Sequence, residues 1–146
     1  MTINIKELLK KKEFQKYIDK LVQYYKEKTV IIYGTGSFFD TILDNYDISK
    51  LNIIALSDKK FDEEIEYKGF RAIPPEKISS LNPDIVLITM LNSEVAEEYF
   101  KETLIPKYGY FKFESATKAS FLDLVIYVIT WLNSSSWVSN DWDIYT

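Results

Sequence analysis

The chain has 146 residues, of which 47% are hydrophobic and 27% charged, and its net charge is −4. This length fits one domain, and the balance is typical of a soluble globular protein. The absence of histidine and cysteine excludes disulfides, thiolate chemistry, Cys/His zinc sites and histidine acid–base catalysis. The acidic charge and the single arginine, Arg71, argue against a nucleic-acid partner.

The N-terminal segment MTINIKELLKKKEF lacks the long apolar run of a secretory signal. Residues 4–27 are predicted to form a helix, because apolar side chains recur there at helical spacing between Lys and Glu. The longest apolar stretch, 120–132, carries Asp123 and is too short to cross a bilayer. We therefore expect a cytoplasmic protein without a membrane span.

Buried strands and helices alternate in the rest of the chain. The β-branched run TVIIY, at 29–33, predicts a strand buried on both faces, and the residues after it predict a helix at 37–46. Further strands are predicted at 52–57, 69–73, 84–90 and 108–113, and further helices at 74–81, 93–105 and 116–132.

This alternation favours an α/β fold with a parallel sheet and helices on both faces. Right-handed crossovers then predict a doubly wound sheet of five parallel strands in the order 3-2-1-4-5. The chain divides into an extra N-terminal helix at 1–28, an α/β domain at 29–133 and a C-terminal tail at 134–146. The tail contains Trp137 and Trp142, a residue type that anchors interfaces.

The motif that bears most on function is YGTGSF, at 33–38. In a dinucleotide-binding turn the first glycine permits the tight turn and the second lets backbone approach the pyrophosphate, and Gly34 and Gly36 suit these roles. Backbone N–H groups at the start of the next helix can bind an anion, and Ser37 can add a hydroxyl. Phe39 stands where a third glycine is usual, so we expect the helix to move outward or the ring to point away from the strand.

An acid follows the second strand at a suggestive position. Asp58 lies about 20 residues beyond Gly36, where an acid would accept hydrogen bonds from ribose hydroxyls. The alternative is an ordinary tight turn with Asp58 as a solvated strand end. The turn is not a P-loop, which needs Gly-Lys-Ser/Thr, and Ile32 stands where a methyltransferase turn usually has an acid.

Four segments between residues 29 and 105 together resemble one known group: VIIYGTGSF, NIIALSDKKF, YKGFRAIPPEKI and NPDIVLIT. They look like the Rossmann-like nucleotide- or nucleotide-sugar-binding modules of bacterial surface-polysaccharide enzymes. Such modules occur at the N-terminus of sugar acyltransferases and in polysaccharide-biosynthesis dehydratases. The chain shows neither the hexapeptide repeats of the acyltransferases nor the large catalytic domain of the dehydratases.

The resemblance implies that residues 29–133 are a single Rossmann-like domain that binds a nucleotide or nucleotide sugar. By position, the glycine turn would face a diphosphate, Asp58 a ribose or base, and residues 89–92 would line the crevice between the first and fourth strands. The candidate nucleotide-binding residues are Gly34, Thr35, Gly36, Ser37, Phe38, Asp58, Lys59, Thr89, Met90 and Asn92.

No catalytic residue and no metal site emerge from the sequence. Tyr-x-x-x-Lys pairs are no more frequent than chance predicts in a chain so rich in both residues, and adjacent acids diverge rather than converge. Asp58, Asp62 and Glu63 could hold Mg²⁺ only loosely. From the resemblance we expect a nucleotide- or nucleotide-sugar-binding module of sugar or surface-polysaccharide metabolism, without catalysis of its own. The cofactor is left open between a nucleotide sugar and NAD.

Two other functions remain open: a small NAD(P)-dependent oxidoreductase, and a degenerate Rossmann domain that only contacts other proteins. We also expect a homodimer through 119–142, because residues 121–132 are apolar around most of a helix and would leave a large exposed patch. The competing arrangement is that the N-terminal helix covers this surface within one chain.

Overall fold

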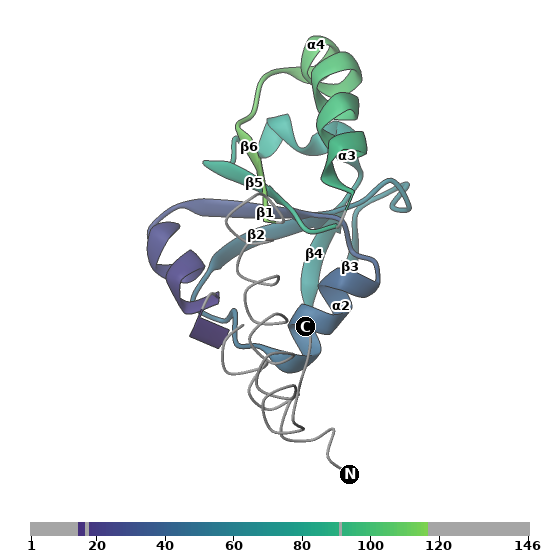
Figure 1. Ribbon diagram of the computed structural model, residues 1–146. Coiled ribbons are helices and arrows are strands. Elements are labelled where there is room, and N and C mark those ends of the chain that lie inside the picture. The colour runs from purple at the N-terminus through teal and green to yellow at the C-terminus, as the bar shows by residue number, and fades with distance from the viewer. Residues whose placement is uncertain (1–14, 17, 91, 117–146) are drawn as a thin grey trace, which may run out of the picture.

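The computed structural model describes residues 15, 16, 18–90 and 92–116. They form a six-stranded sheet in the order β3-β4-β2-β1-β5-β6, with helices on both of its faces (Figure 1). The predicted helix at 116–132, apart from its first residue, the tail at 134–146, and the first part of the N-terminal helix lie outside the described residues.

The middle of the sheet consists of three parallel strands with apolar sequences. β1 (Thr29–Tyr33) lies between β2 (Asn52–Ser57) and β5 (Ile85–Ile88), as predicted for strands buried on both faces. Because the three strands run in the same direction, their carboxyl ends meet at one edge of the sheet. We call this the carboxyl edge.

The prediction of five all-parallel strands in the order 3-2-1-4-5 is wrong. The sheet is mixed, because β3 (Ile65–Tyr67) pairs antiparallel with β4 (Phe70–Ile73). The turn between them contains Lys68 and Gly69, both with positive φ, which suits a two-residue hairpin. Strand β3 is missing from the prediction because three residues among neighbouring acids give too short an alternation to detect.

Two other segments also differ from the prediction. The strand predicted at 108–113 is shifted, because β6 spans Phe113–Ser115 and pairs parallel with β5. The helix predicted at 74–81 is instead two short 3₁₀ helices, η1 (Pro75–Lys77) and η2 (Ser79–Leu81).

The helices cover the sheet from opposite sides (Figure 1). Below it in this view lie α2 (Ser37–Asn45) and the helical residues within 15–24. Above it, α3 (Ser93–Tyr99), the π-helical segment η3 (Phe100–Leu104) and α4 (Ile105–Tyr108) follow one another without a break.

Each face of the sheet has its own apolar core, because successive side chains of a strand point to opposite faces. Ile32 of β1 packs with Phe39 of α2 on one face, and Tyr33 packs with Phe100 on the other. In α3, Val95 is exposed and Ala96 is buried.

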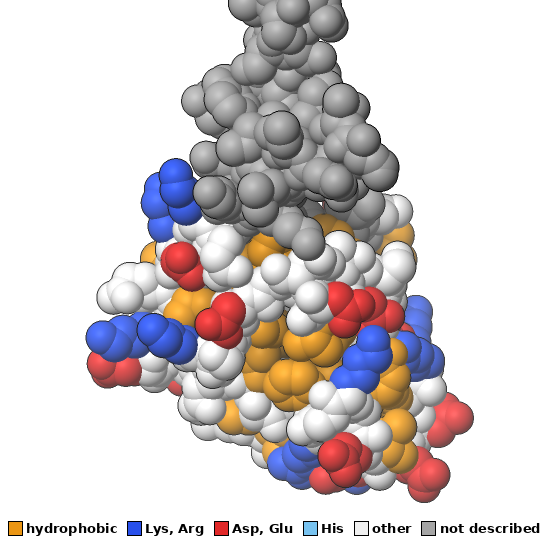
Figure 2. All heavy atoms as spheres, turned by 90° about the horizontal axis from the view of Figure 1, so that it is seen from below, with side chains coloured by type: hydrophobic (Ala, Val, Ile, Leu, Met, Phe, Trp, Pro, Cys, Tyr) orange, Lys and Arg blue, Asp and Glu red, His pale blue; other side chains and the backbone are white. Residues whose placement is uncertain are grey.

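The face that carries α2 retains apolar surface. Ile42, Leu43 and Tyr46 pack against the core but are only partly buried. Figure 2 shows that apolar side chains gather at the centre of this face, with charged side chains around them.

Candidate functional site

The first glycine of the turn is required by the backbone. Gly34 has a φ of +106°, which L side chains rarely adopt. A Cβ atom there would lie 3.0 Å from Met90 Cε and 3.1 Å from the Thr89 carbonyl oxygen. Its N–H donates to the Ser57 carbonyl at 2.9 Å, so Gly34 joins the ends of β1 and β2 and leaves no room for a side chain.

The second glycine stands in open space. Gly36 is the N-cap residue of α2, in extended backbone with a φ of −88°, and no side chain caps the helix. Nothing lies within 4 Å of the position that a Cβ atom would take. Ser37 beside it is exposed. The first turn of α2 therefore presents backbone N–H groups and a hydroxyl, which together can receive an anion.

Phe39 turns into the core. Its side chain is 1% exposed and packs with Val30 and Ile32 of β1. The ring thus fills space between α2 and the sheet. A glycine at this position would let the helix backbone approach the strand more closely.

Asp58 braces the glycine turn. Its Oδ2 accepts hydrogen bonds from the Thr35 N–H at 2.8 Å and the Thr35 hydroxyl at 3.1 Å, and its Oδ1 accepts from the Lys60 N–H at 3.1 Å. Thr35 is fully buried, so its N–H needs this partner. Asp58 therefore holds the loops after β1 and β2 together.

Two lysines follow Asp58 at the carboxyl edge. The Lys60 ammonium donates to the Thr35 carbonyl at 3.0 Å and to the Tyr67 hydroxyl at 3.2 Å. The Lys59 ammonium lies 4.1 Å above the ring of Tyr99, a cation–π arrangement. Lys60 therefore places a positive charge beside the glycine turn, and Lys59 places one on the α3 side of the same edge. Positive charge here favours an anionic ligand.

The residues after β5 contact the turn from the other side. The Thr89 hydroxyl donates to the Gly34 carbonyl at 2.6 Å, and the Thr89 N–H donates to the Tyr33 carbonyl at 2.9 Å. Met90 lies against Gly34. Asn92 is exposed at the N-cap of α3. Thr89 and Met90 thus occupy the space between the ends of β1 and β5.

The structure brings only some of the predicted site residues into contact with one another. Gly34, Thr35, Asp58, Thr89 and Met90 form one connected group through the contacts above, and Gly36 and Ser37 border it at the surface. Lys59 reaches the opposite side through Tyr99. Phe38 is half-buried in the first turn of α2.

Sequence reasoning missed two polar groups at this edge. Ser57 ends β2 fully buried, and its hydroxyl has no hydrogen-bond partner among the described residues. Tyr33 ends β1, and burial, with the Asp58 charge and Tyr99 nearby, raises the pKa of its hydroxyl, which therefore stays protonated. The sequence signal that could have identified Ser57 and Tyr33 is that each is a polar residue at the end of an apolar strand.

Comparison with protein families identifies the chain. Residues 25–108 match the family model described as C2185-like, N-terminal, which covers more than half of the chain. The chain belongs to the C2185-like N-terminal family. The match contains the glycine turn, Asp58 and Thr89–Asn92, and it ends before β6. A comparison with curated proteins gives no match.

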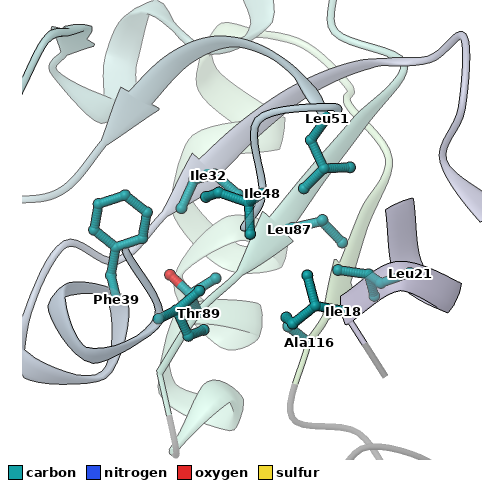
Figure 3. A pocket seen from close by; sticks show the side chains of 10 residues that line it. Ile18, Leu21, Ile32, Phe39, Ile48, Leu51, Leu87, Thr89 and Ala116 are labelled. Atoms are coloured by element: carbon teal, nitrogen blue, oxygen red, sulfur yellow. The ribbon is translucent and has the colours of Figure 1, made fainter. Parts of the chain in front are cut away.

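This C2185-like N-terminal domain also has an apolar cavity beneath the site, with a volume of about 30 Å³. In Figure 3 it lies between Ile18 and Leu21 on one side and Phe39 on the other, below Ile32 and Leu87. Its volume is close to that of one water molecule, and its lining is apolar. We regard it as a gap in the core rather than a ligand site.

Two other features are absent from the described part of the C2185-like domain. No group of three or more acidic side chains there comes together in a way that would hold a metal ion. No helix there combines the length and apolarity that crossing a membrane requires.

Proposed function

We propose that the chain is a cytoplasmic module that binds a nucleotide or nucleotide sugar, in sugar or surface-polysaccharide metabolism, without catalysis of its own. The observation that carries the proposal is the open N-terminus of α2. Gly36 and Ser37 are exposed, the helix has no side-chain cap, and no atom lies within 4 Å of a Cβ position at Gly36. A phosphate can therefore approach the backbone N–H groups closely.

The surroundings of the turn support the same proposal. Asp58 and Gly34 fix the turn before a ligand arrives, so little ordering is needed on binding. The ammonium groups of Lys59 and Lys60 lie at the same edge of the sheet and add favourable charge for a diphosphate. The sequence resemblance to nucleotide-sugar modules points to the same ligand class.

A ligand panel with one designed variant tests the proposal. Thermal shifts are measured with UDP, GDP and dTDP, their sugar conjugates, NAD, NADP, CoA and ATP. A ligand at 100 times its Kd stabilises a protein by about 2.7 kcal/mol, which is readily detected. Gly36→Val should abolish the shift, because the isopropyl group would occupy the phosphate position while the extended backbone tolerates it.

The matched control is Tyr110→Ala, which truncates a side chain that is 75% exposed in the loop before β6, at the opposite edge of the sheet. It should keep the wild-type shift. If Gly36→Val binds the ligand as well as wild type does, the phosphate site lies elsewhere.

A protein-interaction module is the competing candidate. It is favoured by Met90 and Thr89, which fill the space between the ends of β1 and β5 where a dinucleotide would lie. No thermal shift with any member of the panel would decide for this candidate.

Self-association is a second part of the proposal. We propose that the chain forms a homodimer through residues 119–142, because the sequence there combines an apolar segment with Trp137 and Trp142. These residues lie outside the described part of the structure, so the proposal rests on their sequence.

A further inference from the structure

The hydroxyl of Ser57 is unusual for its position in the core. The side chain is fully buried, and among the described residues the hydroxyl has no hydrogen-bond partner. A buried hydroxyl without a partner loses its bonds to water and gains none in return, so alanine would suit this position better in a purely structural role.

Ser57 lies next to the proposed phosphate site. Its carbonyl accepts the Gly34 N–H at 2.9 Å, and the following residue, Asp58, accepts the Thr35 N–H at 2.8 Å. Ser57 is therefore within one residue of both contacts that hold the glycine turn.

The neighbours of Ser57 on the sheet are known from the strand register. It pairs with Tyr33 of β1 and Ile73 of β4, and both belong to the core beneath α3. Side chains at paired positions lie side by side on one face. Tyr99 packs against this same cluster, and the Lys59 ammonium covers the Tyr99 ring at 4.1 Å.

We propose that Ser57 is a binding residue for the sugar of a nucleotide sugar. Its hydroxyl and that of Tyr33 hold hydroxyl groups of the sugar, and the sugar ring stacks on Tyr99 in the place that the Lys59 ammonium occupies in the free protein. This inference rests on the proposed function of the glycine turn.

The hydroxyl groups of Ser57 and Tyr33 suit the sugar of a nucleotide sugar better than they suit the other parts of the ligand. In a nucleotide sugar, the sugar is bonded directly to the terminal phosphate, so it must lie close to the phosphate site. Serine and tyrosine hydroxyls each donate and accept, as sugar hydroxyls do. The burial that raises the pKa of Tyr33 keeps its hydroxyl in the protonated form that can do both.

The Lys59 side chain, which covers the Tyr99 ring, can move aside. Lys59 is exposed, and the ammonium that it places on the Tyr99 ring can return to water when a sugar arrives. Tyr99 is only partly buried, so a shift of its ring opens a path to the Ser57 hydroxyl.

The test compares nucleotide sugars with the matching nucleoside diphosphates by titration calorimetry. The pairs are UDP and UDP-glucose, GDP and GDP-mannose, and dTDP and dTDP-glucose. In wild type one conjugate should bind more tightly than its diphosphate. In Ser57→Ala the Kd of that conjugate should rise about tenfold, the loss expected for one buried hydrogen bond, while the Kd of the diphosphate stays within about twofold.

Two variants and one further measurement complete the design. Tyr99→Leu should also remove the advantage of the conjugate, whereas Ser80→Ala, on the exposed surface of η2, should leave it intact. Unfolding of the ligand-free protein should show Ser57→Ala to be at least as stable as wild type, because no hydrogen bond is lost.

Each other outcome overturns the inference in a distinguishable way. Equal affinity of conjugate and diphosphate, or an equal loss of both in Ser57→Ala, removes the sugar site and leaves the proposed phosphate site standing. A loss of stability in ligand-free Ser57→Ala would mean that the hydroxyl already has a partner. Failure of wild type to bind any nucleotide removes the proposed function and this inference with it.

Discussion

At the scale of single residues, the two glycines of the turn have different roles. Gly34 has a backbone conformation that glycine favours and is enclosed by Thr89 and Met90, whereas Gly36 has ordinary extended backbone and open space around it. The first glycine therefore serves the fold, and the second leaves room for a ligand.

This division predicts opposite effects of the same substitution. Gly34→Ala should lower the free energy of unfolding by about 1–3 kcal/mol, because the methyl group strains the backbone and meets Met90 and the Thr89 carbonyl. Gly36→Ala should cost no more than about 1 kcal/mol, the difference between these residues at an N-cap. Urea denaturation measures both, and equal losses would show that the turn differs from this description.

Asp58 is predicted to matter to the fold before it matters to a ligand. Asp58→Ala removes the acceptor of the Thr35 N–H, the Thr35 hydroxyl and the Lys60 N–H. The free energy of unfolding should fall by about 2 kcal/mol, since bonds to a charged group contribute about 1.5–3 kcal/mol. Asp62→Ala, in the exposed part of the same loop, is the control, and a similar loss in it would refute the bracing role.

The position of Asp58 could be predicted from the sequence, but its partner could not. Spacing from Gly36 placed an acid at the end of β2, beside the glycine turn. Its contact with Thr35 depends on how two loops meet, and the unpaired hydroxyl of Ser57 depends on everything around it. The predicted role of Asp58 toward a ribose stays a prediction.

At the scale of elements, the second core is organised around one aromatic side chain. Phe100, where the π-helical segment begins, makes edge-to-face contacts with Tyr33, Phe111 and Phe113 at centroid distances of 4.8, 5.1 and 5.3 Å. These contacts connect the helix above the sheet to β1 and to the strand at the far edge.

Truncating this ring should be among the most costly changes in the described part of the chain. Phe100→Ala should lower the free energy of unfolding by about 3–5 kcal/mol, the range for a buried phenylalanine. Phe100→Leu retains most of the volume and should cost less. Tyr110→Ala, which removes an exposed ring, should have almost no effect on chemical denaturation, and a comparable loss there would contradict the assignment of this core.

The starts of β1 and β5 are tied by a pair of residues. Asp84 Oδ2 accepts the Thr29 N–H at 2.8 Å, and the Asp84 N–H donates to the Thr29 hydroxyl at 2.8 Å. These bonds hold the pKa of Asp84 below its ordinary value. The charged form of Asp84 therefore stabilises the folded state above that value, and this contribution is lost as the pH falls through the lowered pKa.

This linkage predicts a pH-dependent mutant. Asp84→Asn should be less stable than wild type near pH 7. The difference should begin to shrink below about pH 4, near the ordinary pKa of aspartate, and should disappear once the pH is below the lowered pKa of the folded carboxyl group. Urea denaturation from pH 3 to pH 7 measures the difference, with Asp62→Asn as the control. A difference that stays constant over this range would show that the charge of Asp84 has no part in its contact with Thr29.

Elements were predictable where the chain gives a long signal. The apolar runs of β1, β2 and β5 identify them as buried strands without any further information. The hairpin strand β3 has three residues, and the aromatic residues of 108–113 suit a strand by propensity although 108–112 form the end of α4 and the loop after it. In both cases tertiary contacts decided what local pattern could not.

At the scale of the whole molecule, the order of strands places the site. The segment after β1 crosses below the sheet through α2, and the segment after β5 crosses above it through α3 (Figure 1). The loops therefore diverge between neighbouring strands, and at such points the carboxyl edge of a parallel sheet offers space for a ligand. Alternation of strands and helices predicted this edge, but not the antiparallel strand that makes the sheet mixed.

The homodimer proposal belongs to this scale and has a direct test. Light scattering should give twice the monomer mass for the intact chain, and Ile126→Lys or Ile129→Lys should reduce it to the monomer mass, because a charge in an apolar interface is costly. A chain ending at Asn133 measures the part that Trp137 and Trp142 contribute. A monodisperse monomer of the intact chain at high micromolar concentration would refute the dimer.

The central claim, a phosphate at the N-terminus of α2, is tested most directly by a nuclear magnetic resonance titration of the backbone amides with the best ligand of the panel. Hydrogen bonds from the amides to phosphate oxygens predict the largest shifts at Gly36, Ser37 and Phe38, with little change at Tyr110. The largest shifts at the opposite edge of the sheet, or unchanged amides at 36–38 under saturating ligand, would contradict the claim.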